Sequence, residues 1–474
     1  MWEQSEWDLV ETEVVVVGGG YAGLAAALQL HDHGVDFVLV EASDRVGGRV
    51  LTETLDSGTG GAAVTVDHGG QWVGPTQTRL RALADRFGCA TFPTWETGKH
   101  IEVWHDGTGV PYLGAAPADG PGIADYHRVT ELLDALALTV DTAEPWRTPR
   151  CAEWDAQTAE SFFRAQTSDP DALRRLALAV QGVWCAEPYE ISLFHVLFYI
   201  AAAGGYEQLM ETRDCAQDSR FVTGAAGPAR AVAELLGDRV RLGTRALSVE
   251  HDADGVRVHT AGTVYEARRA VIALPPPAVR TLRFTPELPA ARDGWLAHSL
   301  MGRVAKIHAV YETPFWRDAG LSGIATLYDD GPLGVVFDNS PHNSPHDAAH
   351  GVLVGFVYGD RLSAWSDLDA AARRDAALAS LGSVVGERAA RPLRYTEKIW
   401  SEDPYARGGY EAYVTPGGWT GYGRTGWRTS TGTLHWAGTE TASVWNGYID
   451  GALSSGRRAA DEVVAALQAS VAEG

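Results

Sequence analysis

Glycines and one carboxylate near the N-terminus have the types and spacing of a nucleotide-binding turn. Gly18, Gly20 and Gly23 form the pattern GxGxxG directly after a short β-branched run. A helical segment rich in small residues follows, and the next expected strand ends at Glu41. Such glycines let the main chain approach a pyrophosphate at a helix N-terminus, and the acid binds ribose hydroxyls. We therefore predict a dinucleotide site that includes Ala22; the alternative is a tight turn that only packs against a helix.

Two further glycine pairs favour FAD over a simple nicotinamide cofactor. Gly48 and Arg49 come shortly after Glu41, where a second backbone turn and a guanidinium can contact the phosphates of an extended dinucleotide. A simple NAD site does not need this turn. The second pair continues into larger residues, and this run can bring the main chain flat against a ring system: Gly69, Gly70, Gln71 and Trp72. An ordinary turn before the next helix is the alternative for the second run.

Composition and charge exclude several classes of protein. The chain has 474 residues, of which 45% are hydrophobic and 21% charged, so it can bury a large core and should divide into two closely connected domains. Its formal net charge of −22 repels nucleic acid and acidic membranes, whereas cationic small molecules are natural ligands. No apolar stretch approaches the roughly 20 residues of a membrane span. We therefore expect neither nucleic acid nor a membrane as a partner.

The N-terminus and the cysteines favour a cytoplasmic location without a metal site. The first residues are acidic and lack the basic and apolar regions of a signal peptide. The cysteines have no CxxC spacing, which fits reduced thiols better than disulfides or metal ligands: Cys89, Cys151, Cys185 and Cys215. One loop holds several histidines, and we expect a solvated turn there rather than a metal site: His342, His346 and His350.

The motifs of this chain resemble those of the flavin monoamine oxidase family, in matching order along nearly the whole sequence. They are EVVVVGGGYAGLAAA, EASDRVGGRVLT, DHGGQWVGPTQ, LLGDRVRL, PFWR, GGYEAYVTPG and HWAGTETASVWNGYIDGA. The resemblance implies oxidation of a primary or secondary amine to an imine, which is hydrolysed to an aldehyde or ketone, while O2 is reduced to H2O2. The partners are then a small amine and O2, and a homodimer is a possible assembly.

The resemblance also implies an α/β fold with two domains. A discontinuous, Rossmann-like FAD-binding domain would comprise residues 1–90, 221–276 and 400–474. A substrate-binding domain with a mixed sheet and helices above the flavin would comprise residues 91–220 and 277–399. The patterns along the chain agree with this plan, because helical patterns dominate the middle and strands return after Phe221. Both ends of the chain must then meet at one site.

Lys306 needs an explanation of its own. The chain has only three lysines, and this one lies in an expected strand where Val304, Lys306 and His308 share one face. Spacing alone favours a solvent-facing lysine. The resemblance implies instead that Lys306 holds a water beside the flavin N5 and assists the reaction with oxygen.

The resemblance makes Tyr410 and Tyr448 a pair of aromatic rings that face each other across the flavin. Such a cage would orient a neutral amine, because an enclosed apolar volume favours the deprotonated form. Covalent members of the family carry a cysteine immediately before the first of these tyrosines, where this chain has Gly409. We therefore expect noncovalent FAD.

Further cofactor contacts are implied by the same resemblance. Ser43 stands where an arginine is often found, so that contact is lost or passes to Arg45 or Arg49. Trp400 would contact the flavin ring, and Ala246 the adenine side through its main chain. A turn and a helix start near the C-terminus complete the cofactor site: Gly438, Thr439, Gly447, Tyr448 and Ile449.

The resemblance places four residues around the amine: Gly182, Met210, Gln217 and Phe356. Gly182 stands where the familiar enzymes have a bulkier aliphatic residue, so the cavity can admit larger or differently shaped amines. Gln217 can donate or accept a hydrogen bond near the reacting amine.

Three other functions stay open on sequence alone. An L-amino-acid oxidase would share the fold but needs a cation for the substrate carboxylate, and members of that type place an arginine after the glycine pair, where this chain has Gln71 and Trp72. A polyamine oxidase is a second alternative. A noncatalytic flavin-binding interaction module is the third, and Lys306 and the paired tyrosines argue against it.

Overall fold

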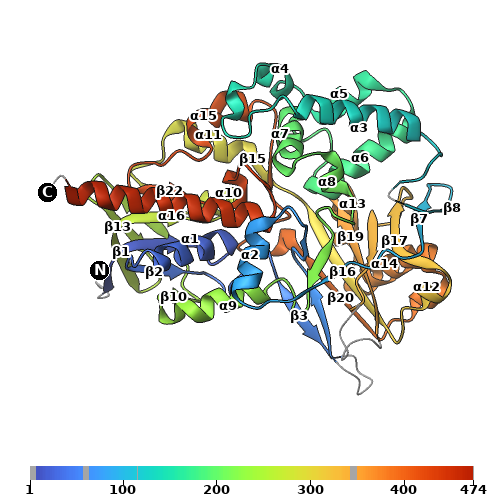
Figure 1. The fold of residues 1–474 in the computed structure, drawn as a ribbon, viewed down its shortest axis with the longest axis horizontal. Helices are drawn as coiled ribbons and strands as arrows, with labels where there is room; N and C mark the ends of the chain where they lie inside the picture. The colour runs from blue at the N-terminus through green and yellow to red at the C-terminus, as the bar shows by residue number, and fades with distance from the viewer. Residues whose placement is uncertain (1–6, 57–62, 115, 342–349, 473–474) are drawn as a thin grey trace.

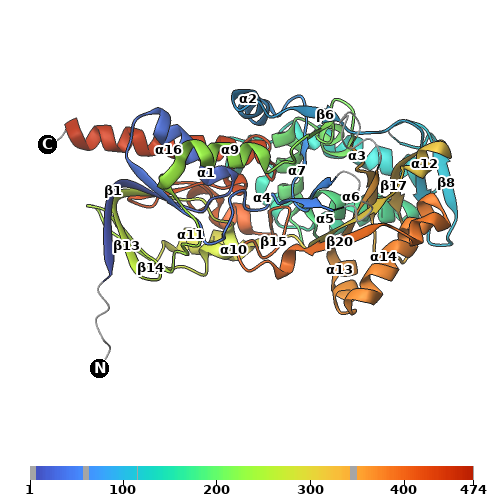
Figure 2. The same ribbon diagram turned by 90° about the horizontal axis from the view of Figure 1, so that it is seen from below.

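The structure is a computed structural model that describes residues 7–56, 63–114, 116–341 and 350–472. Two large sheets organise it, and Figure 1 shows them at opposite ends of the long axis with helices packed around both. β1 and the end of α16, which lie at the two ends of the sequence, are found at the same end of the molecule (Figures 1 and 2).

The first sheet has eight strands in the order β10-β2-β1-β13-β12-β11-β14, with β22 beside β13. Its centre is parallel, because β2, β13 and β1 run in one direction and β22 joins β13 in the same sense. Residues 14–17 of β1 are all buried, as expected of a parallel strand covered on both faces. The strands are β1 Asp8–Val17, β2 Phe37–Val40, β10 Val240–Arg241, β11 Ser248–His251, β12 Val256–His259, β13 Thr263–Ile272, β14 Arg283–Thr285 and β22 Leu434–Trp436.

Helices α1 (Tyr21–Asp32) and α16 (Ile449–Ala472) lie side by side over this sheet, as Figure 1 shows. Their close packing depends on glycines. A Cβ on Gly23 would clash with the carbonyl of Gly18 in the turn after β1, and a Cβ on Gly456 would clash with the carbonyl of Ala22 in α1. The C-terminal helix is thereby fixed against the first turn of the chain. Two more helices pack nearby: α2 Thr78–Arg86 and α9 Gly227–Leu236.

The second sheet has seven strands in the order β20-β16-β19-β18-β17-β7-β8. It is mixed, because β17 and β7 are parallel and the other neighbours are antiparallel. All residues of β16 and β19 are buried. The strands are β7 Lys99–Val103, β8 Gly109–Tyr112, β16 Val304–Tyr311, β17 Leu321–Leu327, β18 Val335–Asp338, β19 Gly351–Tyr358 and β20 Arg394–Ile399.

Helices cover both faces of the second sheet. Leu362 and Trp365 of one helix and Leu378 and Leu381 of the next pack into the core under one face. A separate helical layer lies above the other face (Figure 1). The covering helices are α13 Gly359–Ser366 and α14 Ala370–Val385 below, and α3 Ile123–Ala137, α4 Cys151–Asp155, α5 Ala159–Gln166, α6 Pro170–Trp184, α7 Leu193–Ala203 and α8 Tyr206–Met210 above.

Small sheets and short helices connect the two halves. The paired strands are β3 Thr52–Leu55 with β4 Val64–Asp67, β5 Trp72–Val73 and β6 Thr91–Pro93 with β9 Ser219–Phe221, and β15 Ser299–Met301 with β21 Ala412–Val414. The remaining helices are α10 Pro276–Val279, α11 Ala290–His298, α12 Phe315–Asp318 and α15 Arg424–Gly426. Because β15 pairs with β21 across more than a hundred residues, the C-terminal segment is held beside the second half of the molecule.

The predicted α/β fold class is confirmed, with a largely parallel first sheet and a mixed second sheet. We propose that the two sheets are the centres of the two expected domains. β14 hydrogen bonds to β11, so the first sheet continues past the expected boundary at residue 276. β1 begins at Asp8, earlier than the β-branched run, because its polar first half pairs with β13. No helix in the described part of the chain is long and apolar enough to cross a membrane.

Candidate functional site

A cavity of about 1410 Å³ extends from the ends of β1 and β2 to the helices above the second sheet. This volume exceeds the roughly 300–1,000 Å³ of an ordinary ligand pocket, so a cofactor and a second molecule can share it. Every residue predicted for the site lines the cavity except Gly23. Gly23 faces the turn after β1 instead, so its smallness serves helix packing rather than direct contact with a ligand.

The glycine turn and Glu41 form one end of the cavity. Gly18 has a φ of 108°, and a Cβ there would lie 2.8 Å from the carbonyl oxygen of Ala273, so this position requires glycine. Glu41 accepts hydrogen bonds from the amides of Gly19 at 2.5 Å and Ser43 at 2.8 Å. Burial raises the pKa of Glu41, and these two hydrogen bonds oppose the rise. The turn, the following helix N-terminus and the buried acid fit the pyrophosphate and ribose of a dinucleotide.

Arginines at this end are fixed by the protein itself. Arg45 donates to the main-chain oxygen of Gly48 at 2.9 Å. Arg49 donates to the main-chain oxygen of Tyr410 at 3.0 Å and forms a two-pronged ion pair with Glu440 at 2.5 and 3.1 Å. Both arginines line the cavity, so they offer oriented positive charge to an anionic cofactor.

At the turn around Gly69, the main chain itself lines the cavity, because glycine has no side chain. A Cβ on Gly69 would clash with the carbonyl of Arg49 and would lie 3.0 Å from the ring of Trp400. The indole of Trp400 donates to the main-chain oxygen of His68 at 2.7 Å, which fixes the ring beside this turn. The carbonyl oxygen of Gly69 accepts a hydrogen bond from Nζ of Lys306 at 3.0 Å. The main chain of Gly69, the indole of Trp400 and the ammonium group of Lys306 therefore lie next to one another.

Lys306 is buried, with 2% of its surface exposed, so the solvent-facing alternative is wrong. Its Nζ also donates to Oε1 of Gln71 and lies 5.3 Å from the ring centroid of Phe356 and 5.5 Å from that of Trp72. Burial lowers the pKa of Lys306 to about 7, and the attraction of Asp67 opposes this effect. An ammonium with a pKa near neutrality can hold or release a proton inside the cavity.

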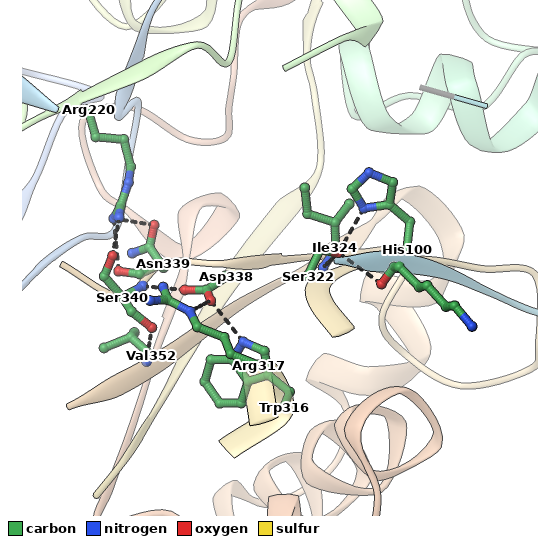
Figure 3. A network of polar contacts seen from close by, with 11 residues as sticks. His100, Arg220, Trp316, Arg317, Ser322, Ile324, Asp338, Asn339, Ser340 and Val352 are labelled. Atoms are coloured by element: carbon green, nitrogen blue, oxygen red, sulfur yellow. Dashed lines mark hydrogen bonds and ion pairs between the residues drawn. The ribbon is translucent and has the colours of Figure 1, made fainter. Parts of the chain in front are cut away.

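Gln71 connects Lys306 to a buried polar network, part of which Figure 3 shows. Its Nε2 donates to Oδ1 of Asn339 at 3.0 Å. Arg220 donates to the same oxygen at 2.6 Å and to the main-chain oxygen of Ser340 at 2.8 Å. Figure 3 shows the Arg220 guanidinium directed at these two residues. The sequence predicted a role for the main chain of Gln71 next to the glycine pair. The structure adds a role for its side chain, which hydrogen bonds to both Lys306 and Asn339.

The two predicted cage tyrosines both line the cavity, and each is fixed by other aromatic residues. The hydroxyls of Tyr410 and Tyr358 lie 3.2 Å apart. The ring of Tyr448 packs edge-on against Trp445 at a centroid distance of 4.8 Å and lies 6.0 Å from that of Tyr199. Burial raises the pKa of both cage tyrosines far above neutrality, so their hydroxyls stay neutral.

The residues predicted around an amine lie in the part of the cavity next to the helical layer. A Cβ on Gly182 would meet no atom within 4 Å, so this position leaves open space. Gln217 donates from Nε2 to the main-chain oxygen of Leu209 at 3.0 Å, while its buried Oε1 has no partner among the described residues. Met210 and Phe356 complete this part of the lining.

Acidic residues also line this part of the cavity, and nearby arginines are paired. Burial raises the pKa of Glu211 to about 7, and the charges of Glu207 and Glu96 add to the rise. Arg175 forms a buried ion pair with Glu102 at 2.5 Å, and Arg213 pairs with Glu96. The lining therefore favours a cation or a neutral base over an anionic substrate.

No cysteine side chain is among the described residues that line the cavity. Cys185 is the cysteine nearest to the cage, since it lies in one hydrophobic cluster with Tyr410 and Trp400. It is not among the residues that line the cavity, and burial raises the pKa of its thiol. Gly409 lines the cavity immediately before Tyr410 and offers no sulfur atom. His342 and His346 lie outside the described residues.

Several residues of the site were not predicted from sequence. Glu440 lies in the motif HWAGTETA, and the lone acid in this otherwise uncharged motif was an available signal. Tyr358 lies two residues after Phe356 on β19 and therefore shares its face. Arg220 and Asn339 carried no local signal, because their partners are far away in the sequence.

The fold and the site define an FAD-dependent oxidoreductase. Residues 21–464 match the family of flavin-containing amine oxidoreductases, and the chain belongs to this family. Its reaction is thus the FAD-dependent oxidation of an amine.

Similar proteins agree with this assignment. Putrescine oxidase of Kocuria rosea is 35% identical over 96% of this chain and 96% of its own length. A flavin-containing amine oxidase of Danio rerio is 33% identical over 96% of this chain and 86% of its own length. The solved structure of cyclohexylamine oxidase from Brevibacterium oxydans IH-35A superposes with a TM-score of 0.90 at 30% identity, covering 97% of this chain and 100% of that one.

Proposed function

We propose that this chain oxidises small primary amines with O2 as the electron acceptor, and that the reacting amine binds between Tyr410 and Tyr448. The observation that carries this proposal is the position of Lys306, which is buried beside Trp72 and Phe356 at the cavity that the two tyrosines line. When bound, FAD supplies the two-electron oxidation. The residues of the chain supply binding, orientation and proton positions.

The cage would select the neutral form of the amine. Tyr410 and Tyr448 remain uncharged. An apolar volume between their rings would disfavour an ammonium ion. Gln217 lines the same cavity, and its amide would hydrogen bond to the amine nitrogen and orient it. We assign Lys306 the task of holding a water or proton beside the ring system for the reaction with O2.

The cofactor residues take roles that follow from their positions. The glycine turn and Glu41 would hold the adenine nucleotide, with Ser43 contributing its main chain and Ala246 lining the same end. Arg49 would face the cofactor while it is paired with Glu440. Noncovalent binding fits the absence of a thiol from the described lining residues.

An aliphatic diamine is a second candidate substrate. Glu96, Glu207 and Glu211 line the cavity on the amine side, where carboxylates would attract a distal ammonium group. The relative from Kocuria rosea is named for putrescine. An amino acid is disfavoured, because Arg175 and Arg213 already have glutamate partners.

Purified enzyme tests these assignments together. Acid denaturation should release yellow FAD into solution, and flavin that stays with the polypeptide would contradict noncovalent binding. A peroxide assay with matched monoamines, diamines and L-amino acids then separates the substrate classes. We expect peroxide from arylalkyl or aliphatic primary amines; activity confined to L-amino acids would overturn the proposal.

We further propose a cytoplasmic homodimer. All four cysteines are free, as is usual for proteins of a reducing compartment. Light scattering on the purified protein tests the assembly, because a mass of one chain at micromolar concentration would contradict a dimer.

A further inference from the structure

Glu411 is a buried carboxyl group that no part of the proposed reaction uses. Its side chain is fully buried, and neither carboxyl oxygen meets hydrogen-bond geometry with any group in the described part of the chain. The residue follows Tyr410 directly, and its main-chain oxygen accepts from the amide of Gly302 at 3.0 Å. Buried polar groups without a partner are rare and costly, so this carboxyl group requires an explanation.

The carboxyl groups of Glu411 and Glu440 both lie near the guanidinium of Arg49. Arg49 forms its ion pair with Glu440. Oε1 of Glu440 also accepts a hydrogen bond from the amide of Ala412 at 3.2 Å. No cation in the described part of the chain forms an ion pair with Glu411. An ionised carboxylate that is buried without a partner is costly enough that the group takes up a proton instead. Burial raises the pKa of Glu411 well above its usual range, and repulsion from Glu440 adds to the rise. The charge of Arg49 and the interaction with the Tyr199 hydroxyl oppose it.

The carboxyl group lies directly behind the second cage residue. A Cβ on Gly447 would clash with both Oε2 of Glu411 and the hydroxyl of Tyr199, so these two oxygens face each other across this glycine. Gly447 precedes Tyr448, and the ring of Tyr199 lies 6.0 Å from that of Tyr448. Glu411 is thus linked to Tyr410 through the chain and is close to Tyr448 through Tyr199.

We propose that Glu411 is a positioning residue that works as a neutral carboxylic acid: its proton bridges to the Tyr199 hydroxyl and fixes the ring beside Tyr448. A charged carboxylate in this place would favour the ammonium form of an amine in the cage, and an ammonium ion has no lone pair to assist its own oxidation. The neutral acid avoids this. Its positioning role rests on the proposed cage, whereas its protonation does not.

Protonation is tested by the pH dependence of stability, with Glu411→Gln against a matched Glu402→Gln control. Glu402 is exposed, so its change removes one carboxylate without altering a buried group. The raised pKa means that folded Glu411 keeps a proton that the unfolded chain loses above about pH 4.3. The wild-type protein therefore loses stability relative to Glu411→Gln as pH rises, by about tenfold in the unfolding constant per pH unit until the folded pKa is reached.

Thermal melts of the FAD-bound proteins from pH 5 to pH 8 give the readout. We expect the melting temperature of Glu411→Gln to gain on wild type steadily across this range, while the Glu402→Gln difference stays constant. The infrared carbonyl band of a protonated acid should also disappear in Glu411→Gln. A constant or opposite trend, with no band lost, would show an ionised Glu411 and overturn the proposal.

The positioning role is tested by steady-state kinetics on the same variants. Glu411→Gln should keep kcat within about twofold and preserve the pH profile of kcat/KM, because an amide is neutral and has nearly the same shape. Glu411→Ala and Tyr199→Phe should both lower kcat roughly tenfold. Unchanged kcat in both variants would overturn the positioning role. If the wild type oxidises no amine, the proposed function fails, while the melting and infrared results still decide the protonation of Glu411.

Discussion

Lys306 and Gln71 are joined by a hydrogen bond from the lysine Nζ to the amide Oε1, although 235 residues separate them in sequence. The other side of the Gln71 amide donates to Asn339, so the amide cannot rotate without losing a buried hydrogen bond. The lysine is thereby aimed at the carbonyl of Gly69 and at the cavity. This arrangement explains how one of only three lysines in the chain can be held without solvent.

Replacing Lys306 should impair the reaction with oxygen more than the reaction with the amine. We expect Lys306→Met to slow reoxidation by about 10²-fold, the usual effect of removing one positioned proton-transfer group. Stopped-flow mixing of the amine-reduced enzyme with O2 measures this rate. Lys398→Met is the matched control, because Lys398 is the cross-strand neighbour of Lys306 but pairs with Asp403. Equal rates in wild type and Lys306→Met would remove the lysine from this step.

The lowered pKa of Lys306 should be visible in stability measurements. Between about pH 7 and the ordinary lysine pKa of about 10.4, the unfolded chain binds a proton that the folded chain has released. Stability should therefore rise with pH across this window, relative to Lys306→Met. Denaturant melts at pH 7, 8 and 9 check the sign. Parallel curves for the two proteins would mean that the pKa of Lys306 is ordinary in the folded state.

Breaking the ion pair between Arg49 and Glu440 should weaken both the fold and cofactor binding. Side-chain exposure is 20% for Arg49 and 6% for Glu440, so Glu440→Gln leaves a nearly buried guanidinium without its partner. A cost of about 3–5 kcal/mol is expected for such a change. The exposed pair of Arg150 and Glu153 gives the control, because solvent screens it and Glu153→Gln should change the stability little. Urea melts and FAD titration of the apoprotein measure both effects, and equal costs would contradict the structural role of the buried pair.

Filling the open space at Gly182 should change which amines fit. Gly182→Leu places a side chain where the cavity is empty, so KM for bulky arylalkyl amines should rise at least about tenfold while short aliphatic amines are less affected. Gly382→Leu is a suitable control, since Gly382 lies within α14, also has no neighbour within 4 Å of a built Cβ, and does not line the cavity. A uniform change for all amines would show that Gly182 does not define the shape of the substrate site.

The sequence was sufficient to predict those parts of the site that are formed by residues close together in the chain. Gly18 and Gly20, the acid at Glu41 and the turn at Gly69 each follow from residues close together in the chain, and the structure places them on one cavity. Strands β10, β11, β12 and β13 also lie where alternation of apolar residues predicts them. Local pattern is sufficient there because each element is specified by its own residues.

Burial and long-range pairing could not be predicted in the same way. Spacing alone predicted that Lys306 lies at the surface, but residues far away in the sequence, on β19, β20 and the Gly69 turn, bury it. The Arg49 and Glu440 side chains meet across 391 residues, and the protonated Glu411 follows from their pairing. These relationships depend on the complete fold, so no window of sequence contains them.

Anaerobic addition of a primary amine to the purified, FAD-bound protein shows whether the bound flavin oxidises amines. We expect the yellow flavin absorbance to bleach at a rate that saturates with amine concentration, and air then to restore the colour with one H2O2 formed for each flavin. A flavin that no mono- or diamine bleaches, in a protein that is folded and fully loaded with FAD, would contradict it.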